Sequence, residues 1–221
     1  MKNTFRIPIL VCLLIIGGTC AAAAQTLDIS SGGTPTITGT LNGSVVGSSS
    51  TQNDLVVTVD FGEVSPASSN SLVKITVPIA VRSSDAYKVT VSASGTSSSN
   101  PQALQRSDIG FGLANWRAMG SNSKVCKKSE HIFYPPYSGD PAGTRTFTSS
   151  GRAAYAATLS NLNSSTTILS GPRLSTGSAT RSNNDGYIFD AVFIITPQFF
   201  AAGSLSMILT FTISDGPNVP C

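Results

Sequence analysis

Residues 72–94 carry the most regular pattern of hydrophobic and polar positions in the chain. Apolar side chains, many of them branched, occupy every second position on both sides of a polar break at Ser83, Ser84 and Asp85. A period of two places them on one face of a β-strand, and the residues of the break favour a turn. The stretch therefore predicts a long antiparallel hairpin with one buried face. Its apolar positions are Val73, Ile75, Val77, Ile79 and Val81, then Tyr87, Val89, Val91 and Ala93.

Similar patterns in the rest of the chain predict an all-β fold. Residues 54–61 and 204–214 also alternate, and residues 187–196 are apolar at most positions, which is typical of a central strand. Pro78 cannot donate a backbone hydrogen bond, so we expect its strand to lie at a sheet edge or to bulge there. Many strands separated by turns, without a repeat of fixed period, predict an antiparallel β-sandwich. Shorter strands are expected at residues 145–148, 153–159 and 166–169, residues 109–113 are a short apolar segment, and one helical turn is expected at residues 101–107.

The first 24 residues have the composition of a secretory signal peptide. Lys2 and Arg6 precede the apolar run 7–16, and small residues follow as far as Ala24. The apolar run is too short to span a bilayer stably. We expect cleavage after Ala24 and export of the remaining chain, and cleavage before Cys20, as in a lipoprotein, is the alternative.

Charge and cysteine content agree with an exported protein. Without Lys2 and Arg6, 12 Lys and Arg residues face 11 Asp and Glu residues, and this balance gives no support for a nucleic-acid or anionic-membrane partner. Cys126 and Cys221 remain after cleavage, and in an oxidising compartment such a pair most simply forms a disulfide. Two free thiols are the other interpretation.

The segment 25–53 separates the signal peptide from the main domain. We expect residues 25–33, which are polar, to be mobile, and residues 47–53 to be a flexible spacer. Residues 36–46 alternate and predict a strand with glycines in its apolar face, which lets that face approach another backbone closely. This strand belongs either to an edge of the same domain or to another chain. Its apolar residues are Ile37, Leu41 and Val45, with Gly39 and Gly43 between them.

Three parts of the sequence together resemble a known family. DFGEVSP at residues 60–66, the pair ITVPIAV and AYKVTVSASG at residues 75–81 and 86–95, and FFAAGSLSMILTFTI at residues 199–213 are similar to the spore-coat-U-like, archaic chaperone–usher pilin subunits. The resemblance implies an incomplete immunoglobulin-like sandwich that an N-terminal strand from the next subunit completes. It also implies neighbouring pilin-like subunits and a periplasmic chaperone as partners. Residues 36–46 are then the candidate donor strand, with Ile37, Leu41 and Val45 filling pockets.

The chain lacks several sequence motifs that mark catalysis or metal binding. The chain contains no G-x-S-x-G elbow, no phosphate-binding G-x-x-x-x-G-K and no C-x-x-C. His131 is the single histidine, which excludes a His-rich zinc site, and we expect it at the surface of a loop. We therefore expect a protein that is not an enzyme and that has no metal and no cofactor. A glycosidase, which needs only two carboxylates close in space, is kept as a third hypothesis.

Residues 115–150 form a long loop within the predicted sandwich domain, residues 54–221, and are the best candidate for a ligand site. Their aromatic side chains could stack on sugar rings, and a basic side chain could meet an acidic group. The other interpretation is that the aromatic side chains pin the loop onto the sandwich. The candidate ligand-binding residues are Trp116, Arg117, Phe133, Tyr134 and Tyr137.

Two functions follow from these features. The first hypothesis is an exported structural or adhesive subunit of a bacterial surface fibre, assembled by strand donation. The second is a stand-alone secreted module that binds carbohydrate or another surface through residues 115–150. In both cases we expect the protein to pass through the periplasm to the cell surface or the exterior.

Overall fold

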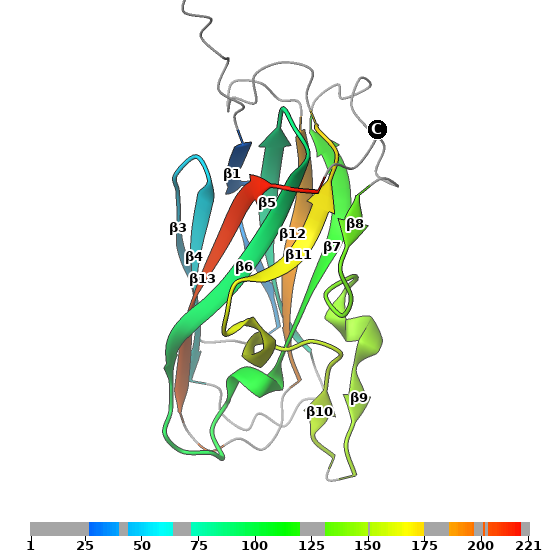
Figure 1. The fold of residues 1–221 in the computed structure, drawn as a ribbon. Coiled ribbons are helices and arrows are strands. Elements are labelled where there is room, and N and C mark those ends of the chain that lie inside the picture. Colours follow the sequence, from blue (N-terminus) through cyan, green and yellow to red (C-terminus); the bar gives the residue numbers. More distant parts are fainter. Residues whose placement is uncertain are drawn as a thin grey trace, which may run out of the picture.

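The computed structural model, which describes residues 27–39, 44–63, 72–119, 131–149, 151–174, 186–196, 201 and 203–217, consists of two antiparallel sheets that face each other (Figure 1). In the described part of the chain, the first sheet has the order β1–β5–β12–β7, and the short strand β2 also pairs with β5. The second sheet has the order β3–β4–β13–β6–β11–β8, and β9 and β10 form a small ribbon. The all-β sandwich predicted from the alternation is confirmed. The strands are β1 (Leu27–Ser31), β2 (Thr36–Thr38), β3 (Ser44–Ser50), β4 (Asp54–Glu63), β5 (Val73–Ser83), β6 (Tyr87–Ser97), β7 (Ile109–Met119), β8 (Ile132–Phe133), β9 (Thr146–Phe147), β10 (Ala153–Ala154), β11 (Thr166–Gly171), β12 (Gly186–Ile195) and β13 (Ser204–Asp215).

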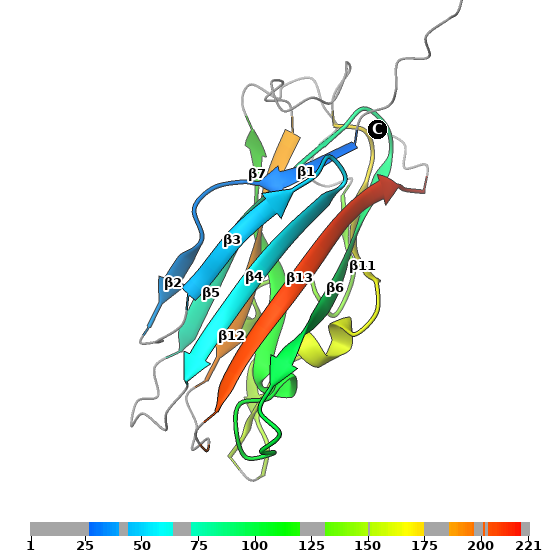
Figure 2. The same ribbon diagram turned by 90° about the vertical axis from the view of Figure 1, so that its left-hand side faces the viewer.

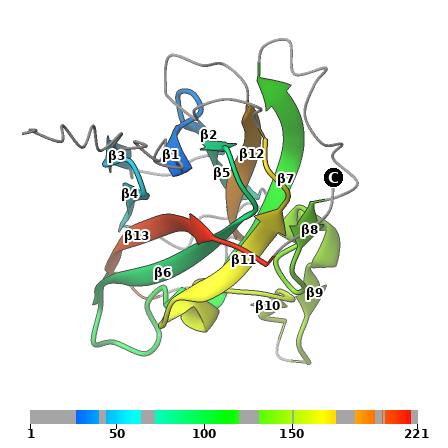
Figure 3. The same cartoon turned by 45° about the horizontal axis from the view of Figure 1, so that its top comes forward.

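Apolar side chains at every second position of the long strands fill the space between the sheets. Figure 3 shows the two layers from one end, with β13, β6 and β11 in one and β5, β12 and β7 in the other. Each buried side chain of this kind stabilises the fold by about 1.5–3 kcal/mol. The buried faces are the ones that the alternation predicts in β4, β5, β6 and β13, for example Leu55, Val57, Val59 and Phe61, and Leu205, Met207, Leu209, Phe211 and Ile213.

β5 and β6 lie in different sheets, so the hairpin predicted for residues 72–94 is wrong. β5 pairs with β1, β2 and β12, whereas β6 pairs with β13 and β11. The Asp85 N–H donates to the Ser83 hydroxyl at 3.1 Å and the Ala86 N–H to the Asp85 carboxylate at 2.7 Å, so the polar break does turn the chain, but from one sheet to the other. Alternation specifies which face of a strand is buried, but it does not specify which other strand it pairs with.

Pro78 lies in the middle of β5, and the neighbouring edge strand is interrupted opposite it. β1 pairs with β5 as far as Ser31, and β2 resumes the pairing at Thr36, so the regular pairing is interrupted between these two residues. The Gly32 N–H donates to the Pro78 carbonyl at 2.8 Å. Because the nitrogen and the carbonyl of a strand residue point to the same neighbour, the nitrogen of Pro78, which has no hydrogen, also faces this edge strand. The neighbour bulges, rather than the strand that carries the proline. β12, by contrast, pairs with β5 and β7 along its length, as its apolar pattern predicts.

The N-terminal segment differs from its prediction in two ways. Residues 25–33 were expected to be mobile, but Leu27–Ser31 form β1, with Leu27 and Ile29 buried in the core. Residues 36–46 were expected to form one strand, but their described parts belong to β2 in the first sheet and β3 in the second. Gly39 has φ +100°, and a Cβ there would lie 2.9 Å from the carbonyl oxygen of Leu72, just before β5. Gly39 therefore directs the chain out of the first sheet. It does not serve the close approach of a strand to another backbone, which the pattern predicts. β3 also includes residues 47–50 of the expected spacer.

The described helices are short 3₁₀ turns: η1 (Arg106–Asp108), η3 (Pro141–Thr144) and η4 (Leu159–Leu162). Within the ranges given above, no helix is long and apolar enough to cross a membrane. The expected signal peptide, Leu41 and both cysteines of the expected disulfide, Cys126 and Cys221, lie outside the residues that the structure describes.

Candidate functional site

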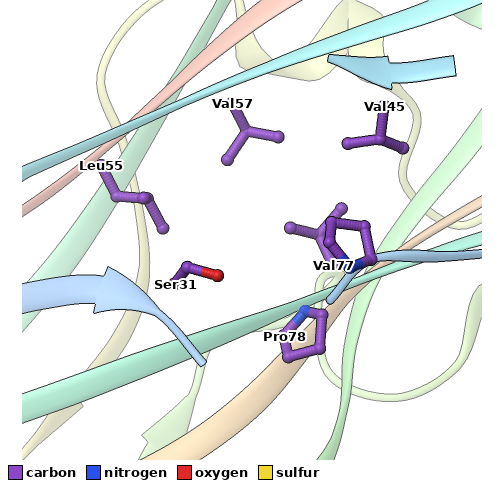
Figure 4. Close-up of a pocket in the computed structure, with 7 residues that line it drawn as sticks. Ser31, Val45, Leu55, Val57, Val77 and Pro78 are labelled. Carbon is purple, nitrogen blue, oxygen red and sulfur yellow. The ribbon is translucent and has the colours of Figure 1, made fainter. Parts of the chain in front are cut away.

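An apolar cavity opens at the edge of the sandwich where the first sheet is interrupted. Its volume is about 190 Å³, and it lies between β1, β3, β4, β5 and the connection that follows β1 (Figure 4). Figure 4 shows Val45, Leu55 and Val57 of the second sheet on one side and Val77 and Pro78 of the first sheet on the other. A cavity lined in this way suits an aliphatic side chain better than a polar ligand. The lining residues are Ser31, Pro35, Val45, Leu55, Val57, Val77 and Pro78.

β1 borders this cavity and contacts both sheets. It pairs with β5 over its whole length, from Leu27 to Ser31. On its other side the Ile29 N–H donates to the carbonyl of Gln52, in the connection between β3 and β4, at 3.0 Å. The Ile29 side chain is fully buried. Figure 2, which faces this edge, shows β1 and β2 following one another beside β3 and β4. β1 therefore joins the edges of the two sheets.

A buried ion pair also connects β1 to β5. Asp28 and Arg82 are directly opposite each other in the strand register. Arg82 Nη1 lies 2.9 Å from Asp28 Oδ2 and donates to the Ser30 hydroxyl at 3.1 Å. The side chains of the arginine and the aspartate are only 7% and 3% exposed. Removing one partner of such a pair leaves a buried charge without its counter-ion, which is strongly destabilising.

The three residues predicted for a donor strand have separate positions. Ile37 lies in β2 opposite Ile75 and is 37% exposed, whereas Val45 lies in β3, is half-buried and lines the cavity. Leu41 is outside the described residues. The sequence interpretation missed β1, which supplies the deeply buried N-terminal side chains. A signal was present, since Leu27 and Ile29 alternate with Asp28 and Ser30, but it covers too few residues to be distinctive.

Of the candidate ligand residues, Trp116 and Phe133 are in contact and both pack into the structure. The Trp116 ring stacks on Tyr187 at a centroid distance of 4.7 Å and meets the edge of Phe133 at 5.2 Å. Trp116 is 9% exposed. Asn115, with φ +53°, occupies a bulge in β7 where the register with β12 shifts, and this bulge turns Trp116 inward. Residues 115–119 of the expected loop continue β7, and residues 132–133 form β8, so Trp116 and Phe133 lie in strands of the sandwich.

Arg117, Tyr134 and Tyr137 have separate partners and do not join a common surface with Trp116. Arg117 Nη1 lies 2.9 Å from the carboxylate of Asp190, which also accepts a hydrogen bond from the side-chain amide of Asn115. The Tyr134 hydroxyl lies 3.0 Å from the Ser170 hydroxyl. Tyr137 is buried, with its ring 5.9 Å from that of Phe111. A shallow hollow of about 320 Å³ remains beside Trp116, lined by Leu113, Ala114, Asn115, Trp116, Phe133, Ser138 and Gly139.

His131 is buried, so the expectation of a surface histidine is wrong. Its ring packs against Trp116 at 4.8 Å and Tyr187 at 5.2 Å. A Cβ on Gly171 would lie 2.3 Å from the His131 ring, so the glycine provides the space for the imidazole. The histidine is therefore part of an aromatic cluster between β7, β12 and β11 and does not lie at the surface of a loop.

Burial raises the pKa of three tyrosines, Tyr87, Tyr137 and Tyr155. Burial raises the pKa of Tyr87 well above its ordinary value, and the nearby Tyr187 adds to this effect. Burial also raises the pKa of Tyr155, and hydrogen bonds with Thr196 act in the opposite direction. Among the residues with described positions, no three His, Cys, Asp or Glu side chains come close enough together to hold a metal ion.

Comparison of the chain with protein-family models, with curated proteins and with solved structures finds no match. The resemblance to spore-coat-U-like subunits therefore rests on the sequence motifs given above. The class that the structure defines is an antiparallel β-sandwich with an interrupted N-terminal edge strand.

Proposed function

We propose that the protein is an exported structural subunit of a bacterial surface fibre, in which each subunit receives the N-terminal strand of a neighbouring copy. The observation that carries the proposal is the position of β1 and β2, an interrupted edge strand beside an apolar cavity that opens between the sheets. Without β1 and β2, one whole side of β5 exposes unpaired backbone groups. Such an edge is a template for a strand from another chain.

In a single chain, β1 satisfies this edge within the same molecule. Exchange of an identical element between copies forms the same contacts between chains, which makes strand exchange a low-cost route to assembly. When each copy gives its strand to the next one, the contact is head-to-tail, and repeated head-to-tail contacts form fibres when they do not close into a ring. The geometry of one chain is in this way compatible with a polymer of many.

The donated segment in this proposal begins with β1. Leu27 and Ile29 are its buried anchors, and backbone pairing with β5 supplies most of its hydrogen bonds. This places the principal anchors before residues 36–46, the segment that the sequence pattern favours. Of the residues predicted there, Val45 contributes to the receiving cavity rather than to the donated strand.

Further parts of the proposal rest on the sequence and on the family resemblance. They are the cleaved signal peptide 1–24, passage through the periplasm with a chaperone as partner, an immunoglobulin-like topology, and a disulfide between Cys126 and Cys221. The proposal also includes neighbouring pilin-like subunits at the cell surface as partners. The packing of Trp116, Phe133 and Tyr137 against other aromatic rings supports a structural role for these side chains.

The test compares the full exported chain with a variant that lacks residues 25–38. We expect the wild type to form head-to-tail oligomers, and unlabelled and isotope-labelled pools to form mixed species in native mass spectrometry. The deletion variant should not polymerise, but should bind one synthetic peptide of residues 25–38 when the two are refolded together. A peptide with Leu27→Asn and Ile29→Asn is the control and should not bind. A wild type that stays monomeric at every concentration, or a deletion variant that polymerises normally, overturns the proposal.

A stand-alone binding module is the second candidate, and the hollow beside Trp116 is the observation that favours it. Phe133, Ser138 and Gly139 are among the residues that line the hollow, and one face of Trp116 is covered by Tyr187. A glycan array with the wild-type chain tests this candidate. Binding that Phe133→Ala removes supports it, and an array without signal eliminates it.

A further inference from the structure

The Asp28–Arg82 pair is a buried, directional contact between the side chains of β1 and β5. The two residues are register partners, 2.9 Å apart between Nη1 and Oδ2, and both are almost fully buried. Ser30 adds a second acceptor for the same guanidinium nitrogen at 3.1 Å. β1 also pairs with β5 through backbone hydrogen bonds, and Leu27 and Ile29 pack into the core.

Backbone pairing and apolar packing do not by themselves select the donor, because any strand with apolar residues at the positions of Leu27 and Ile29 can provide them. A strand that lacks an acidic residue beside Arg82 leaves the buried guanidinium without this counter-ion. Loss of one partner of a buried ion pair is strongly unfavourable.

We infer that the Asp28–Arg82 pair selects the partner of the exchanged strand, forming within one subunit before assembly and between neighbouring copies afterwards. This inference rests on the function proposed above. Every copy carries the aspartate on its strand and the arginine on its body. A second copy of this chain is therefore the matching donor, and a strand without an acidic residue at the position of Asp28 is rejected by the buried arginine.

Reciprocal charge reversal tests the inference. In Asp28→Arg the strand carries a positive charge that faces Arg82 of its own body, and in Arg82→Asp the body carries a negative charge that faces its own Asp28. Each variant is mismatched with itself. When the two are refolded together, the strand of each matches the body of the other. We expect each variant alone to lose assembly, and the mixture to form mixed oligomers over single-type ones by at least about tenfold, because like charges at an interface are strongly unfavourable.

Two controls keep the result interpretable if a single variant fails to fold. The double variant Asp28→Arg with Arg82→Asp restores a matched pair within each copy and should assemble with itself. Reversal of the Arg152–Asp108 pair, whose partners both belong to the body of the subunit, should give no recovery on mixing. Single variants that assemble like the wild type, or a mixture that shows no preference for mixed oligomers, overturn the inference while the proposed function stands. A wild type that does not exchange its strand overturns the proposed function itself.

Discussion

The hydroxyl of Tyr87 is buried without a hydrogen-bond partner in the described structure, and this lowers the stability of the folded state. A polar group in this position has lost its contact with water and gained nothing in return. We therefore expect Tyr87→Phe to raise the free energy of unfolding by about 1 kcal/mol. Urea denaturation followed by circular dichroism measures this change.

Tyr155→Phe is the matched control and should act in the opposite direction. The Tyr155 hydroxyl lies 2.8 Å from the Thr196 hydroxyl and accepts the Thr196 N–H at 3.0 Å. Thr196 is buried, so its N–H would be left without this acceptor, and we expect a loss of about 1–3 kcal/mol. Equal effects of the two substitutions would contradict the assignment of Tyr87 as the tyrosine without a partner.

Single residues also limit what the sequence could predict about the site. Asn115 adopts a left-handed conformation, and the resulting bulge changes which side chains of β7 point inward. Continued alternation from Ile109 and Leu113 would have turned Asn115 inward and Trp116 outward. The ion pair of Asp28 with Arg82 was equally inaccessible, because nothing in the sequence shows which distant strands become neighbours.

At the scale of elements, β1 and β2 pair with the same strand but differ in how firmly they are attached. Ile29 of β1 is fully buried, whereas Ile37 of β2 is 37% exposed. We expect Ile29→Ala to lower the free energy of unfolding by about 2–5 kcal/mol, as for other large-to-small core substitutions. Ile37→Ala should cost less than about 1 kcal/mol, as is usual near the surface.

Thermal unfolding of the two isoleucine variants, with hydrogen exchange at the β5 amides that face β1, checks this prediction. Ile29→Ala should expose those amides, and Ile37→Ala should leave them protected. The reverse order would mean that β2, rather than β1, holds the edge of the first sheet. The donor segment would then have to be moved back towards residues 36–46.

The elements that the sequence predicts well are the ones with long, uninterrupted alternation. The buried faces of β4, β5, β6 and β13 and the central place of β12 follow directly from the pattern. The pairing of β5 with β6 does not, because strands on opposite sides of one core bury their apolar faces equally well. The single strand predicted for residues 36–46 is wrong for a related reason. Gly39 is compatible with a flat strand and also with the turn that it forms.

At the scale of the whole molecule, both candidate sites result from how the two sheets meet. The cavity at the N-terminal edge takes its walls from both sheets, and the aromatic cluster around Trp116 joins β7 and β12 to β8 of the second sheet. No local sequence pattern specifies such places, because their residues are far apart in the chain. They become visible only once the order of the strands is known.

The core between the two sheets also determines how the stability of the molecule changes at alkaline pH. Burial raises the pKa of Tyr87 above its value in the unfolded chain, which is about 10. Below that value both states bind the proton, and the stability due to this group is fully present. As the pH rises further, the unfolded state loses its proton first, so the free energy of unfolding falls by about 1.4 kcal/mol per pH unit from Tyr87 alone. Urea titrations between about pH 9 and about pH 12 measure the slope, which should be smaller in Tyr87→Phe by this amount. A second readout is the phenolate absorbance of Tyr87. Because β6, which carries Tyr87, is central to the second sheet, this absorbance should appear only together with global unfolding.

If instead the phenolate of Tyr87 forms in the folded protein near pH 10, the cluster of Tyr87, His131 and Tyr187 opens to water without loss of the sandwich.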